Sequence, residues 1–174
     1  MGAVIIVVKT VFLVLVLILA TLGILPIHID SAQAEENAVN YTLTDLKYRD
    51  FSHKDLHGTS FAGAVMWGAN FQGANMQQTI ITKGDFFQAN LSDVDFTDTF
   101  ADRVTFDQTD LTNAISTDAM MSSSTFGNAV VTGADFSGAI VDRYQVKLMC
   151  KNASGINPIT GVPTRDSLGC PLKP

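Results

Sequence analysis

The sequence predicts an all-β solenoid between residues 46 and 141, and two observations carry that prediction. Every fifth residue of this stretch is large and apolar, except Ala101 and Ser116. The residue two places before each of these is small from Thr59 to Ala139, being Ala, Thr, Ser, Gly or Val. A period of five matches neither a helix nor a strand. It is typical of a solenoid, in which each repeat buries its apolar face against its neighbours.

Individual repeat units resemble a known family. Gly68-Ala69-Asn70-Phe71-Gln72, Gln88-Ala89-Asn90-Leu91-Ser92 and Gly133-Ala134-Asp135-Phe136-Ser137 are similar to the A(D/N)LXX unit of pentapeptide-repeat proteins. The resemblance covers about a hundred residues in one unbroken register. It implies a right-handed quadrilateral β-helix with four pentapeptides per coil, and therefore about five coils over residues 41–143.

With twenty residues per coil, the inward apolar residues stack in four columns, one per side. We name the sides by their first such residue: Leu46 for the first, Phe51 for the second, Leu56 for the third and Phe61 for the fourth. On the first side we expect a buried phenylalanine ladder of Phe86, Phe106 and Phe126. Ala101 and Ser116 are the expected weak points of the core, because each fills its place poorly.

Residues 1–34 are expected to direct export. Thr10 to Ile27 carry no charge, which is long enough for a membrane-spanning helix and also suits a signal-peptide core. Ala32-Gln33-Ala34 is a cleavage motif, so two outcomes stay open: a removed signal peptide or a retained hydrophobic anchor helix. A retained helix would contact lipid or pigment, although Thr10–Ile27 hold no histidine to ligate chlorophyll. Residues 35–40 form a short polar linker.

The first coil is expected to be distorted. Arg49 and Lys54 occupy positions where small inward residues belong, and long cations do not enter a narrow core. His53 and His57 flank Asp55, but no fourth ligand is visible, so we expect no metal site there.

The outward residues suggest where partners bind. On the fourth side the outward positions form an apolar column: Ile80, Phe100, Met120 and Ile140. A basic edge lies beside it, made of Lys83, Arg103 and Arg143, and Trp67 and Phe87 stack on the first side. An aligned apolar row is typical of a contact surface, so these are the expected partner-binding residues. The alternative is that the C-terminal segment folds back over the fourth side.

Residues 144–174 are expected to cap the last coil, as a solenoid requires. Apolar residues at helical spacing predict a helix over 142–151, with Asp142 as its N-cap. Cys150 and Cys170 are most simply a disulfide in an exported protein, and a regulatory redox pair is the alternative. The signal segment, the repeats and this two-cysteine tail together resemble the thylakoid-lumen pentapeptide proteins of cyanobacteria and chloroplasts. That resemblance implies a lumenal, non-enzymatic role.

Composition and motifs argue against several classes of function. The formal net charge of −6 disfavours nucleic acid as a partner. No nucleophile triad, metal constellation or phosphate loop is present, so we expect no enzyme and no cofactor. The leading hypothesis is a structural subunit or assembly factor of a photosynthetic membrane complex, with photosystem II favoured. A soluble redox-responsive lumenal scaffold is the alternative. A DNA-mimicking topoisomerase inhibitor is disfavoured, because its target is cytoplasmic.

Overall fold

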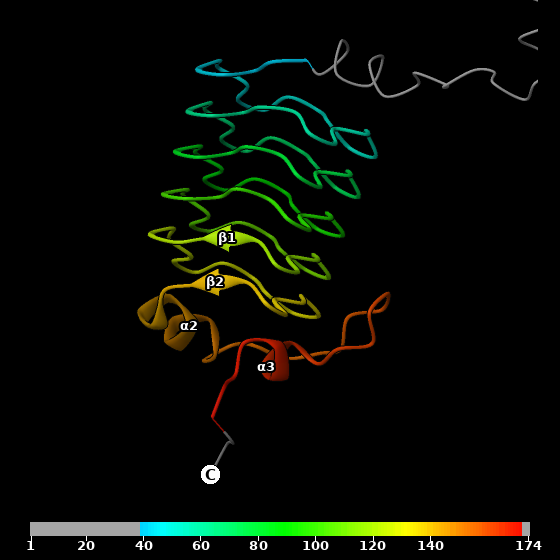
Figure 1. Cartoon of the computed structure of the whole chain (residues 1–174), viewed down its shortest axis with the longest axis vertical. Coiled ribbons are helices and arrows are strands. Elements are labelled where there is room, and N and C mark those ends of the chain that lie inside the picture. The colour runs from blue at the N-terminus through cyan, green and yellow to red at the C-terminus, as the bar shows by residue number, and fades with distance from the viewer. Residues whose placement is uncertain (1–38, 172–174) are drawn as a thin grey trace, which may run out of the picture. The chain divides into compact units, whose positions relative to one another are not determined.

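The structure is a computed structural model that describes residues 39–171 (Figure 1). The chain divides into two compact units, residues 1–37 and 38–174. The expected signal peptide or anchor helix lies outside the described residues. The described residues all belong to the second unit.

Twenty-residue coils build this unit, stacked one on another (Figure 1). Parallel bridges join residues twenty apart, from Asn40 with Ser60 to Ile115 with Asp135. Two of the bridging segments are long enough to count as strands, β1 (Met120–Met121) and β2 (Ile140–Val141), and they pair in parallel. The expected coil length is thus the observed one.

A tight turn forms each corner of the tube. The Arg49 N–H donates to the Leu46 carbonyl at 3.2 Å, and the same bond recurs around the coils. The third residue of the turn has a positive φ, for example 57° at Tyr48 and 63° at Gly73. This is the type II geometry, which favours glycine at that position. At Gly73 there is a second reason, because an added Cβ would lie 2.6 Å from the His53 ring of the coil before.

The core consists of stacked inward side chains, as expected. Phe86 and Phe106 stack with ring centroids 5.6 Å apart, and Phe106 and Phe126 follow at 5.1 Å. Phe51 and Phe71 form a second stack on the neighbouring side, at 4.8 Å. Rings on opposite sides meet edge to face, as Phe51 and Phe61 do at 6.0 Å, so the aromatic core is continuous across the tube.

Polar residues inside the tube are satisfied to different degrees. The Ser124 hydroxyl donates to the Ala101 carbonyl and accepts from the Val104 N–H at 2.9 Å. Ser116 is equally buried, but its hydroxyl has no hydrogen-bond partner among the described residues. Its place in the stack is therefore both underfilled and polar.

The predicted distortion of the first coil is wrong. Residues 45, 50 and 55 keep their parallel bridges, and the Arg49 and Lys54 amides close ordinary turns. Both cations are exposed, so their long stems carry the charges out of the tube. The backbone register is set by the apolar residues beside them, not by the cations.

The C-terminal cap contains two short helices, α2 (Arg143–Met149) and α3 (Thr164–Ser167). Asp142 occupies the N-cap position of α2 without capping it, and its carboxylate accepts the Ser123 N–H at 3.2 Å. Side-chain oxygens of the cap accept hydrogen bonds from backbone amides of the last coil. Gln145 Oε1 accepts from the Phe126 N–H and Ser167 Oγ from the Phe136 N–H, both at 3.0 Å. The open edge of the last coil is thus partly hydrogen-bonded.

The C-terminal segment covers part of the third side, not the fourth. The Asn157 side chain donates to the carbonyls of Asn113 at 3.0 Å and Gly133 at 2.9 Å. Asp135, expected to be an outward solvent-facing residue, is 1 % exposed beneath this segment. The alternative that the tail folds back over the fourth side is therefore wrong for the described part of the tail, and no segment within residues 39–171 covers the apolar column.

Candidate protein-docking surface

The four residues of the apolar column lie in register. Bridges join Ile80 to Phe100 and Phe100 to Met120, and the β1–β2 pairing joins Met120 to Ile140. Their exposed fractions are 45 %, 51 %, 40 % and 55 %, in chain order. They point outward because successive residues of an extended segment alternate, and the residues on either side of each face the core.

Backbone hydrogen bonds hold this surface from both neighbouring coils. The Phe100 N–H donates to the Thr79 carbonyl of the coil before at 2.9 Å, and the Met120 carbonyl of the coil after accepts from the Ala101 N–H at 2.7 Å. Beneath it, the Thr79 and Thr99 hydroxyls both donate to the Met76 carbonyl, at 2.8 and 2.9 Å. The column therefore stands on a backbone whose polar groups are hydrogen-bonded within the tube.

The basic edge borders the column at one corner. Lys83 and Arg103 occupy equivalent corner positions, with φ of 59° and 57°, and Arg143 begins α2 one coil beyond Ser123. All three cations are exposed. Arg103 Nε also contacts Asp102 Oδ2 at 2.6 Å within the chain. Lys83 and Arg103 therefore line this corner, and Arg143 lies in α2.

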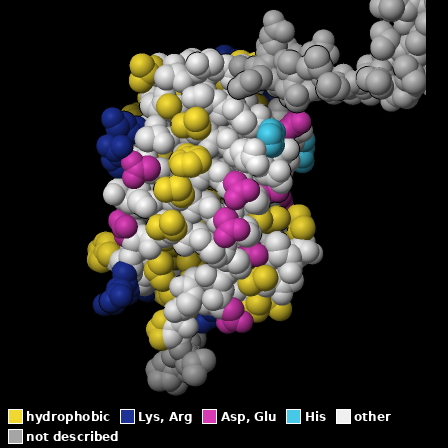
Figure 2. Space-filling view, viewed as in Figure 1, with side chains coloured by type: hydrophobic (Ala, Val, Ile, Leu, Met, Phe, Trp, Pro, Cys, Tyr) yellow, Lys and Arg dark blue, Asp and Glu magenta, His cyan; other side chains and the backbone are white. Residues whose placement is uncertain are grey.

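An acidic edge borders the column at the opposite corner. It consists of Asp98 and Asp118, which are exposed and also have positive φ, at 58° and 56°. Figure 2 shows the resulting surface, a row of apolar side chains with acidic residues on one flank and both basic and acidic residues on the other. Sequence reasoning missed these two residues. The signal was present, because they lie two positions before Phe100 and Met120 in the same twenty-residue period.

A second apolar surface lies on the first side, beyond the basic edge. Trp67 and Phe87 meet at 6.3 Å in an edge-to-face arrangement, and Trp67 is 41 % exposed. Lys47 Nζ lies 5.0 Å from the Trp67 ring centroid and 3.1 Å from Asp45 Oδ2. This cluster is smaller than the column and already has a cation in place.

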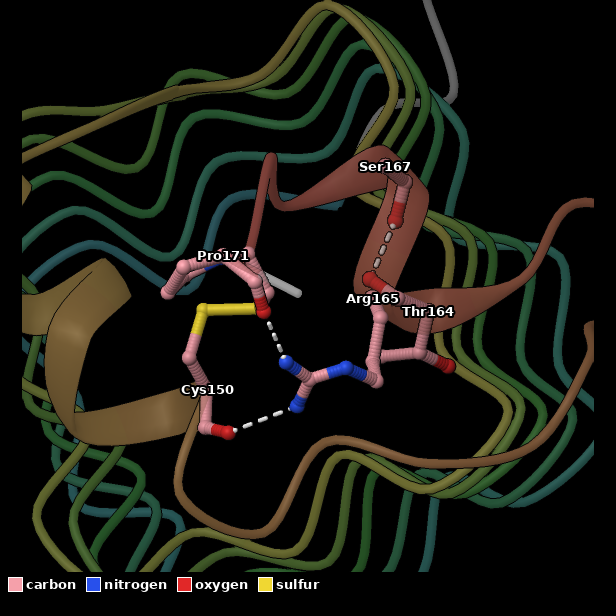
Figure 3. The surroundings of a disulfide bond; sticks show 6 residues. Cys150, Thr164, Arg165, Ser167 and Pro171 are labelled. Atoms are coloured by element: carbon pink, nitrogen blue, oxygen red, sulfur yellow. Dashed lines mark hydrogen bonds between the residues drawn. A yellow bond between two sulfur atoms is a disulfide. The ribbon is translucent and has the colours of Figure 1, made fainter. Parts of the chain in front are cut away.

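The two cysteines form a disulfide that closes the cap (Figure 3). Arg165 lies beside it and donates to the carbonyl of Cys150 at 3.0 Å and of Pro171 at 2.5 Å. Both ends of the disulfide loop are therefore also tied by one guanidinium. A shallow cavity of about 360 Å³ opens next to Cys150, with Lys147 and Lys151 among its lining residues.

Other candidate sites can be placed as well. The His53 ring packs over Gly73, and within residues 39–171 no group of three His, Cys, Asp or Glu side chains gathers to hold a metal ion. No helix in the same range is long and apolar enough to cross a bilayer.

Comparisons with known proteins agree with the repeat and the fold. A family model described as pentapeptide repeats (8 copies) matches residues 42–78, 89–127 and 102–138. A crystal structure of a pentapeptide repeat protein from the Arabidopsis thaliana thylakoid lumen has a TM-score of 0.73 and 32 % sequence identity. That match covers 76 % of this chain and 92 % of the other.

A curated relative points the same way. The chloroplast thylakoid lumenal protein TL20.3 of Arabidopsis thaliana is 57 % identical over 44 residues, which is 25 % of this chain and 16 % of that protein. The match thus spans only about a sixth of the relative. The relatives support a right-handed quadrilateral β-helix and a thylakoid-lumen location, and the matches indicate no catalytic family. The chain belongs to the pentapeptide repeat family.

Proposed function

We propose that this protein is a non-enzymatic interaction subunit or assembly factor that docks on a photosynthetic membrane complex from the thylakoid lumen. We favour photosystem II as that complex, because it has a large lumenal protein surface. The lumenal relatives support the compartment. The docking surface is the apolar column with its charged edges.

The exposure of the apolar column carries this proposal. About half of each side chain stays in water, so covering all four would contribute roughly 3–6 kcal/mol. Aligned apolar rows of this kind are typical of protein contact sites, whereas isolated exposed apolar residues are ordinary. The charged edges would then orient the partner and speed its association.

We further propose that the apolar segment before Glu35 is retained and tethers the protein to the membrane. The support is the uncharged run from Thr10 to Ile27, which equals the length of a short membrane span. Mass spectrometry of the native N-terminus tests this point. A chain starting at Met1 or Gly2 is expected, and one starting at Glu35 would contradict it.

A redox-responsive scaffold is the second candidate, and the disulfide favours it. Both cysteines are only half-buried, so a dithiol reductant can reach them. Partner capture that changes with reduction of Cys150–Cys170 would support this role. Capture that is indifferent to reduction would exclude it.

Capture from detergent-solubilised thylakoids tests the docking proposal. The full chain should retain subunits of the membrane complex, and Phe100→Glu should lose at least about nine-tenths of that capture, because it buries a charge at the contact. Val130→Glu is the matched control, since Val130 is outward and 48 % exposed on the second side. Recovery of free protein only, or equal loss with both variants, would contradict the proposal.

A further inference from the structure

The charges around the apolar column have a self-complementary order. Along one coil of the fourth side the chain passes Asp98, Phe100 and Arg103, which places an acid at one corner, an aromatic ring between and a base at the other. Arg103 Nε also lies 2.6 Å from Asp102 Oδ2 at its own corner. We infer that a second copy of this chain occupies the column when the membrane complex does not, lying side by side with the first and running in the same direction. This inference rests on the same exposed column as the proposed function.

Symmetry explains why a second copy fits. If the two-fold axis runs parallel to the two tubes, between their facing fourth sides, each apolar residue lies opposite the same residue of the other copy. The axis also exchanges the two corners, so the acidic edge of one copy faces the basic edge of the other. Phe100 of one copy then contacts Phe100 of the other. Asp98 of each copy faces Arg103 of the other, once on each flank. Asp102, already paired with Arg103 in its own copy, lies on the same flank. At the equivalent positions of the other coils Gln78 faces Lys83, Asp118 faces Ser123 and Gly138 faces Arg143, so none of these pairs opposes like charges.

The antiparallel arrangement is disfavoured by the same charges. A two-fold axis perpendicular to the tubes and parallel to the facing sides keeps each corner on its own flank and reverses the order of the coils. Asp98 would then face Asp118, and Lys83 would face Arg143. Like charges opposite one another weaken an interface, whereas the parallel pairing opposes unlike ones.

The proposed N-terminal tether would favour the parallel pair too. If both copies are anchored in one membrane, both must begin their first coil at the same end. The contact is small, with four half-exposed apolar side chains per copy, so it falls below the usual size of a permanent interface. We therefore expect a dissociation constant on the order of 100 µM, weak enough for the membrane complex to displace the second copy.

Sedimentation of the purified full chain in detergent, over a range of concentrations, tests the pairing. Phe100→Glu should raise the dissociation constant about tenfold or more, while Val130→Glu leaves it unchanged. Both variants keep the N-terminal segment, so pairing through that segment would survive Phe100→Glu and overturn the inference. A chain that stays monomeric at about 500 µM would overturn it as well.

A charge exchange tests the edges. Asp98→Arg alone and Arg103→Asp alone should each weaken pairing severalfold, about the effect of one or two exposed ion pairs. The double variant should restore it, because the symmetric contacts are re-formed with their signs exchanged. Asp and Arg each already occupy this positive-φ corner in the chain, so the exchange places no new demand on the backbone. A double variant as weak as the single variants would overturn the edge pairing.

Cysteine cross-linking fixes the direction. Ile80→Cys should form a covalent dimer with itself under mild oxidation, and Ile140→Cys likewise. Cross-links that form only when the two variants are mixed would show the antiparallel pair and overturn the inference. These measurements use the purified protein alone, so pairing without complex capture rejects only the proposed function, and capture without pairing rejects only this inference.

Discussion

Two buried serines test how polar atoms are tolerated inside the tube. Ser116 has no hydrogen-bond partner among the described residues, so Ser116→Ala removes a desolvated hydroxyl and should raise the free energy of unfolding by about 1 kcal/mol. Ser124 is hydrogen-bonded to Ala101 and Val104, so Ser124→Ala should lower it by about 1–2 kcal/mol. Denaturant titration of both variants measures the difference. A loss of stability on Ser116→Ala would show that its hydroxyl is satisfied.

Two aspartates of the first coil should respond to acid. The Lys47 backbone N–H, and then its ammonium, hold the pKa of Asp45 below its ordinary value, and the Ser52 N–H does the same to the pKa of Asp50. Their contribution is present above the unfolded-state pKa, near 4, and is lost as pH falls through the lower folded value. Carboxyl NMR titration should give lower midpoints in the folded chain than in the unfolded one. Equal midpoints would contradict these hydrogen bonds.

Within the cap, Asn157 is the residue on which the covering of the third side depends. Its amide donates to three carbonyls of the solenoid, and its oxygen accepts from the Ile159 and Thr160 N–H groups, at 3.0 and 3.1 Å. Asn157→Ala should lower the free energy of unfolding of the cap by at least about 2 kcal/mol. Asn152→Ala is the control, because Asn152 is exposed. Similar hydrogen exchange in both variants at Gly133, whose N–H donates to Ser154, would contradict this role.

The disulfide should stabilise the cap without being its sole closure. Removing a bridge that closes a loop of about 20 residues costs roughly 3 kcal/mol. Because Arg165 still binds the carbonyls of Cys150 and Pro171, reduction alone should speed tryptic cleavage after Lys151 only moderately. Reduction of an Arg165→Ala variant should speed it much more. Equal cleavage rates in the two reduced proteins would show that the guanidinium adds nothing.

At the scale of the whole molecule, strict periodicity decides what the sequence can predict. The coil length, the phenylalanine ladder and the apolar column all repeat every twenty residues, and each was predictable. Asp98 and Asp118 follow the same period and could have been predicted. The cap does not repeat: its path over the third side depends on individual contacts, such as those of the Asn157 side chain with the Asn113 and Gly133 carbonyls, which no pattern marks. The expected distortion of the first coil does not occur, because the Arg49 and Lys54 side chains extend their charges into water and do not enter the core.

Site-specific photo-cross-linking in thylakoid membranes probes the docking surface in place. A photoreactive residue at Met120 should give a covalent adduct with a lumen-exposed subunit of a photosynthetic complex, together with a smaller yield of homodimer. The same residue at Val130 should give neither. Adducts of equal yield from both positions, or none from Met120, would contradict docking through the apolar column.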